Sequence, residues 1–227
     1  MESKVAAART ALLAGATGLV GRALLSMLLA AKQYSSVHIM VRRALPDIKA
    51  NAKLEVHQVD FALLPDAFPR VDDVFITLGT TIKVAGSEAA FRKVDFDFVV
   101  NTAKAARAAG ASRLAVVSAL GADPGSRVFY NRVKGEMEAA IVQLGYESVV
   151  IAHPSLLLGD RAALGQPQRS GEAWAARLLE PLGWIVPRGV RPIPARTVAS
   201  ALLVAILAAK PGVQVLKSRA MQAGNQI

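Results

Sequence analysis

Short apolar runs alternate along the chain with longer stretches in which apolar residues recur at helical spacing. This alternation is typical of a parallel β-sheet covered by helices, because each strand is buried on both faces and each crossover needs a helix. We expect strands at residues 10–14, 37–41, 54–59, 73–78, 114–118, 148–153 and 213–216. We expect helices at residues 19–31, 88–109, 129–144, 172–182 and 197–208.

The order of these elements predicts an α/β fold with a doubly wound, mostly parallel, Rossmann-like sheet. The chain has 227 residues, which suits one domain with a small appendage and is cramped for two equal domains. We therefore predict a single domain over residues 1–227, in which residues 154–195 form a small C-terminal cap.

The segment GATGLVG follows the first expected strand and precedes the first expected helix. Glycines at this place allow a tight turn, a close approach of a ligand and close packing of the helix on the sheet. The amides and the positive dipole at the start of a helix also bind anions such as a pyrophosphate. The alternative is that the glycines only pack helix against strand, and their GxxGxxG spacing differs from the commoner GxGxxG. The expected contacts of a dinucleotide here are Gly15, Thr17, Gly18, Leu19, Val20 and Gly21.

The second expected strand ends in Arg42 and Arg43, and no acidic residue follows before Asp47. In NAD-binding units an acid at this place binds the ribose, whereas an arginine suits the phosphate of NADP. Because guanidinium groups pair well with phosphate oxygens, NADP is predicted as the cofactor and NAD is less favoured. The alternative is that both arginines only face solvent. Asp60 and Phe61, after the third strand, are further candidates, and Asp60 would contact the adenine edge or cap the following turn.

The strand at residues 114–118 ends at Ser118, and Tyr130 and Lys134 share one face at the start of the next expected helix. Ligands in such sheets bind outside the carboxyl ends of the strands, where these groups and the glycine turn would converge. A lysine ammonium beside a tyrosine stabilises its phenolate, so the tyrosine can exchange a proton at neutral pH. An isolated YxxxK would more simply be a surface pair.

This combination resembles the short-chain dehydrogenase/reductase superfamily, and within it the atypical, extended-like group of Tat-interacting-protein-like oxidoreductases. The resemblance spans about residues 12–182 and is carried by GATGLVG, LGTTIKVAGSEAAFRKVDFDFV, VSALGA, YNRVKGEMEAAI and HPSLLLGDR. It implies catalytic roles for Ser118, Tyr130 and Lys134, the tyrosine acting as general acid or base and the lysine also holding a ribose hydroxyl. It further implies cofactor contacts from Leu78, Gly79, Thr80, His153 and Pro154. Many members have a water-anchoring asparagine where this chain offers Asp95 and Asn101, and neither residue is assigned that role.

The formal net charge is +10, which attracts nucleic acids, acidic membranes and phosphorylated ligands alike. The basic residues are scattered with few aromatics among them, so nucleic acid is not an expected partner. No apolar run approaches the roughly 20 residues of a membrane span. The absence of cysteine excludes disulfides and thiolate metal sites, and without an export signal a cytoplasmic location is expected. No metal site is predicted, because His38, His57 and His153 lie far apart in the sequence.

The sequence thus predicts an NADP-dependent oxidoreductase that transfers a hydride to or from a small carbonyl or alcohol substrate. The alternative is an NADP(H)-binding regulator or sensor that acts through a protein partner, and a homodimer is also possible. An intact Ser118, Tyr130 and Lys134 favours the enzyme, because a sensor needs no general acid.

Overall fold

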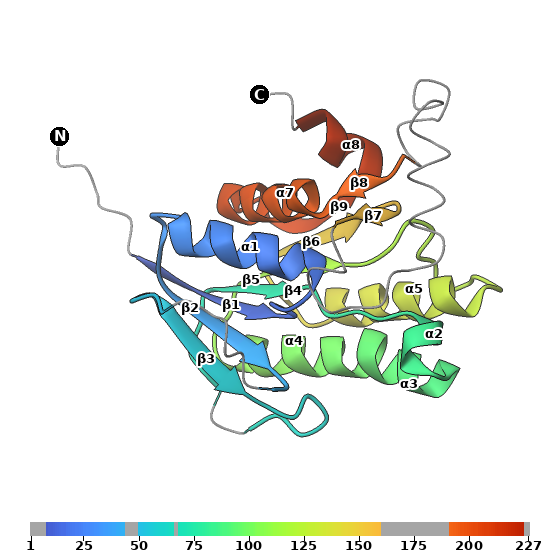
Figure 1. Ribbon diagram of the computed structural model, residues 1–227, viewed down its shortest axis with the longest axis horizontal. Coiled ribbons are helices and arrows are strands. Elements are labelled where there is room, and N and C mark those ends of the chain that lie inside the picture. The colour runs from blue at the N-terminus through green and yellow to red at the C-terminus, as the bar shows by residue number, and fades with distance from the viewer. Residues whose placement is uncertain (1–7, 44–49, 66–67, 160–190, 225–227) are drawn as a thin grey trace.

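A parallel sheet of seven strands, in the order β3-β2-β1-β4-β5-β6-β9, forms the centre of the molecule (Figure 1). The computed structural model describes residues 8–43, 50–65, 68–159 and 191–224. The strands are β1 (Arg9–Ala14), β2 (Tyr34–Val41), β3 (Leu54–Gln58), β4 (Asp73–Ile76), β5 (Arg113–Val117), β6 (Ser148–His153) and β9 (Gly212–Lys217). The direction in which strands are added reverses between β1 and β4, and this switch point leaves a crevice at the carboxyl ends of the strands.

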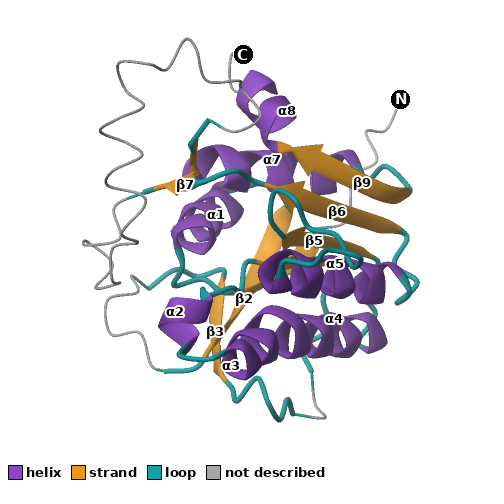
Figure 2. Cartoon of the chain, turned by 90° about the vertical axis from the view of Figure 1, so that its right-hand side faces the viewer, coloured by secondary structure: helices purple, strands orange, loops and turns teal. Residues whose placement is uncertain are grey.

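Helices cover both faces of the sheet. Figures 1 and 2 show α1 (Leu19–Ala30) and α7 (Ala195–Ala208) on one face, and α4 (Val99–Ala108) and α5 (Phe129–Val142) on the other. The shorter elements are α2 (Ile82–Ala85), α3 (Glu88–Arg92), the π-helical turn η1 (Lys93–Phe98), β7 (Leu157–Leu158), β8 (Ile193–Pro194) and α8 (Ser218–Ala223).

The central strands read as continuous apolar runs because both of their faces are buried. In β1, Leu13 belongs to the core under α1 and α7, whereas Leu12 belongs to the core under α4 and α5. Both side chains are fully buried. The edge strand β3 differs, since its side chains are exposed or half-buried.

The predicted fold class is confirmed, and the differences from the expected elements are local. The helix expected over residues 88–109 is made of α3, η1 and α4, because a π-helical turn interrupts the α-helical hydrogen bonds. Strand β2 begins at Tyr34, three residues before its expected start. The helix expected at residues 172–182 and most of the expected cap lie outside the described residues, so the division into domain and cap stays a prediction. Among the described helices, none has the length and apolarity needed to cross a membrane.

Candidate functional site

The glycine turn lies between β1 and α1, and its three glycines have different surroundings. Gly15 has a positive φ of 95°, and a Cβ there would lie 2.7 Å from the carbonyl carbon of Thr77. A Cβ on Gly21 would overlap the carbonyl oxygen of Gly15, so this glycine lets the helix start close to the turn. At Gly18 the nearest atom would be 3.5 Å away, which leaves this position open to a ligand.

The first turn of α1 begins after Gly18 and contains no acidic residue. The amides of a first helical turn have no partner within the helix, and the helix dipole makes this end positive. An open glycine followed by such amides is the arrangement that accepts a phosphate group. The turn therefore fits the pyrophosphate of a dinucleotide.

A cavity of about 830 Å³ lies at the carboxyl ends of the strands, where the crevice is expected. Its size is within the usual range of small-molecule sites. Fourteen of the predicted site residues line it: Gly15, Thr17, Gly18, Leu19, Val20, Arg42, Phe61, Leu78, Gly79, Thr80, Ser118, Tyr130, Lys134 and Pro154. The residues of the glycine turn and of the YxxxK pair thus share one cavity.

The other four predicted residues do not line this cavity. Gly21 packs the helix on the turn, and Arg43 is exposed beside Arg42. Asp60 Oδ1 accepts a hydrogen bond of 2.8 Å from the amide of Ala62. Asp60 therefore caps the following turn, which is the second of the two roles considered for it. His153 contacts an acidic side chain of α5, as described below.

Lys134 forms a buried ion pair inside the site. Its Nζ lies 2.7 Å from Asp95 Oδ1, and both side chains are almost completely excluded from solvent. Asp95 Oδ2 accepts a hydrogen bond of 2.8 Å from the amide of Thr80, which fixes the carboxylate against the cavity wall. Within the described residues, Oδ1 has no hydrogen-bond partner beyond this ion pair.

The charge of Lys134 is set by two opposing effects. Burial alone would lower the pKa of the ammonium, but the charges of Asp95 and, to a smaller extent, Tyr130 and Glu138 raise it above its ordinary value. Lys134 is therefore an ammonium at neutral pH. The spacing of the YxxxK pair predicts that Lys134 and Tyr130 interact electrostatically, and the effect of Tyr130 on the pKa of Lys134 agrees with this.

Glu138 contacts side chains at the ends of two neighbouring strands. Its Oε1 accepts a hydrogen bond from Ser118 Oγ and lies 2.9 Å from His153 Nε2. Ser118 and His153 come from the ends of β5 and β6, while Glu138 lies one turn after Lys134 on α5. The predicted serine thus has an acidic partner that the sequence reasoning missed, although its spacing of four residues from Lys134 was visible.

Tyr130 is half-buried at the start of α5, and its ring lies 5.1 Å from the ring of Phe91, measured between centroids. Phe91 is fully buried in α3. The aromatic contact holds the tyrosine on the cavity wall beside the ammonium of Lys134.

The Rossmann-like sheet, the glycine turn and the cavity at the switch point together define a dinucleotide-binding domain. Residues 15–156 match the family described as NAD(P)H-binding, and the chain belongs to this family. Within it, the resemblance to the Tat-interacting-protein-like group of atypical short-chain dehydrogenases/reductases is confirmed by homology to the proteins HTATIP2 and FMP52.

The protein FMP52 of Eremothecium gossypii, named as mitochondrial, is 38% identical over 152 residues, which are 66% of this chain and 67% of that protein. HTATIP2 of Rattus norvegicus is 36% identical over 167 residues, which are 72% of this chain and 66% of that protein. The chain therefore matches about two thirds of each relative. The cytoplasmic location expected for this chain stays a prediction. The relative FMP52 is named as a mitochondrial protein, which is a different compartment.

Solved structures show the same fold. MoeE5 in complex with UDP-glucose and NAD has a TM-score of 0.69 at 18% identity, covering 91% of this chain and 75% of that one. WbmG of Bordetella bronchiseptica in complex with NAD has a TM-score of 0.68 at 18% identity, covering 96% and 75%. These likenesses show the fold, whereas NAD(P) binding rests on the family match, which leaves the choice between NAD and NADP open.

Proposed function

We propose that the protein is an NADP-dependent oxidoreductase that transfers a hydride to or from a small carbonyl or alcohol substrate. The observation that carries this proposal is that Ser118, Tyr130 and Lys134 line one cavity with the glycine turn. A bound NADP would supply the hydride chemistry, with its pyrophosphate at the turn after β1. The chain's own residues would handle the proton.

In the proposed mechanism Tyr130 donates its proton to the carbonyl oxygen during reduction and removes it from the alcohol during oxidation. Lys134, kept as an ammonium by Asp95, stabilises the phenolate that forms when this proton leaves. In the structure Ser118 Oγ donates its proton to Glu138, so in the proposed mechanism the hydroxyl would turn from Glu138 to donate to the substrate carbonyl oxygen.

The test of this mechanism is Tyr130→Phe, which removes the proton donor and keeps the ring. Against a panel of small aldehydes and ketones, we expect NADPH oxidation to fall by at least about 100-fold, because general acid catalysis contributes that much. Cofactor affinity should change little. Tyr146→Phe is the matched control, since the Tyr146 hydroxyl donates to the carbonyl oxygen of Ala103 in the core under α4 and α5. Activity that survives in Tyr130→Phe would refute the mechanism.

The NADP preference is proposed on Arg42, which lines the cavity, whereas Arg43 does not. A guanidinium at the end of β2 suits the 2′-phosphate that distinguishes NADP from NAD. Thermal stabilisation of the wild-type protein should be larger with NADPH than with NADH at equal concentration. Arg42→Ala should remove most of this difference and Arg43→Ala, the control, should keep it. Equal stabilisation by both cofactors in the wild type would refute the preference.

The alternative function, an NADP(H) sensor acting through a protein partner, would need the glycine turn but no proton donor. A wild-type protein that binds NADPH and oxidises it with no member of the carbonyl panel would favour this alternative over the enzyme.

A further inference from the structure

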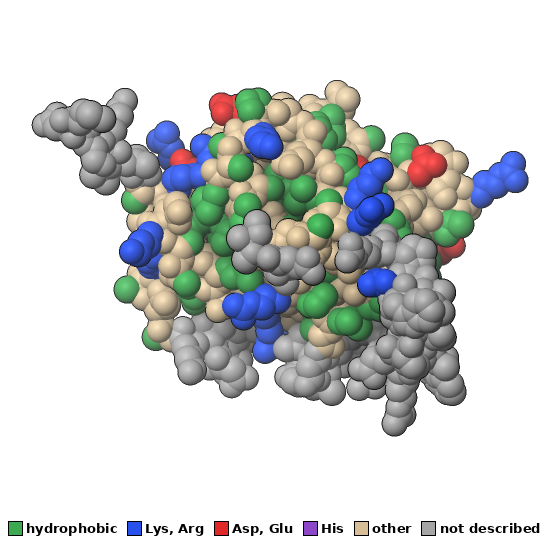
Figure 3. All heavy atoms as spheres, turned by 90° about the horizontal axis from the view of Figure 1, so that it is seen from above, with side chains coloured by type: hydrophobic (Ala, Val, Ile, Leu, Met, Phe, Trp, Pro, Cys, Tyr) green, Lys and Arg blue, Asp and Glu red, His purple; other side chains and the backbone are tan. Residues whose placement is uncertain are grey.

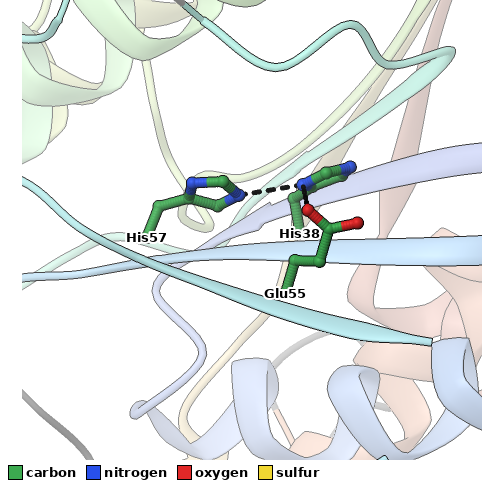
Figure 4. Close-up of side chains that lie close together, drawn as sticks. All are labelled: His38, Glu55 and His57. Carbon is green, nitrogen blue, oxygen red and sulfur yellow. Dashed lines mark hydrogen bonds and ion pairs between the residues drawn. The ribbon is translucent and has the colours of Figure 1, made fainter. Parts of the chain in front are cut away.

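A second group of ionisable side chains lies on the edge strands, separate from the cofactor cavity. Figure 4 shows His38 of β2 facing Glu55 and His57 of β3. His38 Nδ1 is 2.8 Å from His57 Nε2 and 3.4 Å from Glu55 Oε2. One ligand atom from each of the three side chains lies within 4.8 Å of the other two.

The sheet register explains this grouping. His38 is directly opposite Glu55 in the parallel pairing of β2 with β3. His57 follows Glu55 by two positions, so both side chains stand on the same face of β3. Strand pairing therefore brings together histidines that the sequence separates by 19 positions.

We propose that His38, Glu55 and His57 form a binding site for a divalent transition-metal ion of the Zn²⁺ type. Two imidazoles and one carboxylate are a donor set that Zn²⁺ uses in proteins, with a fourth position left for water or a ligand. Glu55 is exposed, so an ion can reach the site from solvent.

The observed spacings are close to those that zinc needs. With bonds of about 2.0–2.1 Å, tetrahedral zinc places its ligand atoms roughly 3.4 Å from one another. The distance from His38 to Glu55 already has this value, at 3.4 Å. The two imidazole nitrogens would have to separate by about half an ångström, which a side-chain rotation can provide.

Neighbouring groups favour the ligand form of His38. Ser36 Oγ lies 3.4 Å from His38 Nε2 and donates to Glu55 Oε1 at 3.1 Å. A proton on Nε2, directed at this hydroxyl, leaves the lone pair of Nδ1 facing His57. Oxygen partners of this kind orient histidines in known metal sites.

A bound ion would have a definite structural effect. Among the strands that the structure describes, β3 is at the edge of the sheet and pairs with β2 alone. A metal held by both strands would link this edge to the sheet by a second connection, next to the residue pair His57 and Met40. Met40 lines the cofactor cavity, but none of the three proposed ligands does. Binding of the ion can therefore be measured independently of cofactor and of activity.

The test is a Zn²⁺ titration of the untagged full chain by calorimetry, together with Co²⁺ as a spectroscopic probe. The wild-type protein should bind one equivalent with a Kd in the micromolar range or below, and Co²⁺ should show the visible absorption of a four- or five-coordinate ion. Because the chain has no cysteine, thiolates cannot contribute to either signal.

His57→Ala and Glu55→Gln should each weaken Zn²⁺ binding at least tenfold, and both residues are accessible enough for the variants to fold. His153→Ala is the matched control, because it removes the remaining histidine outside this site and should leave Zn²⁺ affinity unchanged. Thermal unfolding without metal checks that each variant is folded. The proposal is overturned if the wild type binds no Zn²⁺ at 100 µM, or if His57→Ala and Glu55→Gln both retain wild-type affinity.

Discussion

The buried ion pair between Lys134 and Asp95 can be isolated by the substitution Asp95→Asn. Asparagine has nearly the shape of aspartate, and its side-chain oxygen can still accept the hydrogen bond from the amide of Thr80. The substitution removes the negative charge facing Lys134 Nζ and, because the oxygen stays with Thr80, also replaces the acceptor Oδ1 by an NH2 group. What it leaves is an ammonium in a fully buried position without its counter-charge.

The expected cost follows from this burial. Removing one partner of a buried ion pair destabilises a protein by about 3–5 kcal/mol, because the remaining charge is desolvated without compensation. Solvent screening does not reduce this figure here, since both side chains are almost completely inaccessible. For a domain of this size the loss corresponds to a fall in Tm of roughly 6–20 °C.

The pH dependence of stability gives a second signature. In the wild type the folded-state pKa of Lys134 is raised, so the pair stabilises the protein at neutral pH and this contribution is lost only as pH rises through that pKa. In Asp95→Asn the largest cause that raises the pKa is absent, and we expect burial to lower it. The variant should then lose stability as pH falls below the ordinary alkaline value of a lysine. The difference between the two proteins should be largest near neutral pH and shrink toward pH ~10.

The assay is urea denaturation followed by circular dichroism at several pH values, with Lys134→Met and the double variant completing a thermodynamic cycle. The double variant should be more stable than the sum of the single losses predicts, because it leaves no unpaired charge. A change in unfolding free energy below about 0.5 kcal/mol for Asp95→Asn at neutral pH would refute this reasoning.

Two further pairs of substitutions test the glycine turn and the core. Gly21→Ala should destabilise the fold by roughly 1–3 kcal/mol, since its Cβ overlaps a backbone oxygen of the turn. Gly18→Ala should change the free energy of unfolding by less than ~0.5 kcal/mol and weaken NADPH binding. A larger loss of stability in Gly18→Ala than in Gly21→Ala would contradict these roles of the two glycines. Tyr34→Phe removes a hydrogen bond of 2.6 Å to the buried carboxylate of Asp73 and should cost about 1.5–3 kcal/mol in urea unfolding. Tyr146→Phe, which removes a hydrogen bond to an uncharged carbonyl oxygen, should cost less.

The distribution of basic side chains can be followed on one face of the molecule. On the face shown in Figure 3, the lysine and arginine side chains form several separate groups and no continuous stripe. A site for a nucleic-acid backbone needs basic side chains that follow one path. The expectation that nucleic acid is not a partner stays a prediction, and binding to DNA at physiological ionic strength would refute it.

The fold could be predicted from the sequence because the apolar runs of the central strands and the glycines of the first turn are local features of the chain. Leu12 and Leu13 are adjacent and are buried on opposite faces, which only a sandwiched strand allows. The ion-pair partner of Lys134 could not be predicted in this way, because Asp95 lies 39 positions away in a π-helical turn that no helical spacing predicts. The meeting of His38 with His57 also depends on strand register, which spacing along the chain does not contain.

The site gains its rigidity from helix α5, which holds Tyr130, Lys134 and Glu138 at intervals of four residues and so along one face. Lys134 is bound to a carboxylate from the segment after β4, and Glu138 is bound to side chains at the ends of β5 and β6. Gly135 fixes the helix as well, since a Cβ there would overlap the backbone of Pro124 in the loop after β5.

The helix that carries Tyr130 is therefore tied by Lys134 to the turn η1 and by Glu138 to the ends of β5 and β6. A residue that only lines a binding pocket does not need this support, because small displacements cost a binding contact little. A proton donor does need it, since its distance from the reacting oxygen must be held to about half an ångström. This difference is the physical reason for preferring the oxidoreductase over the sensor.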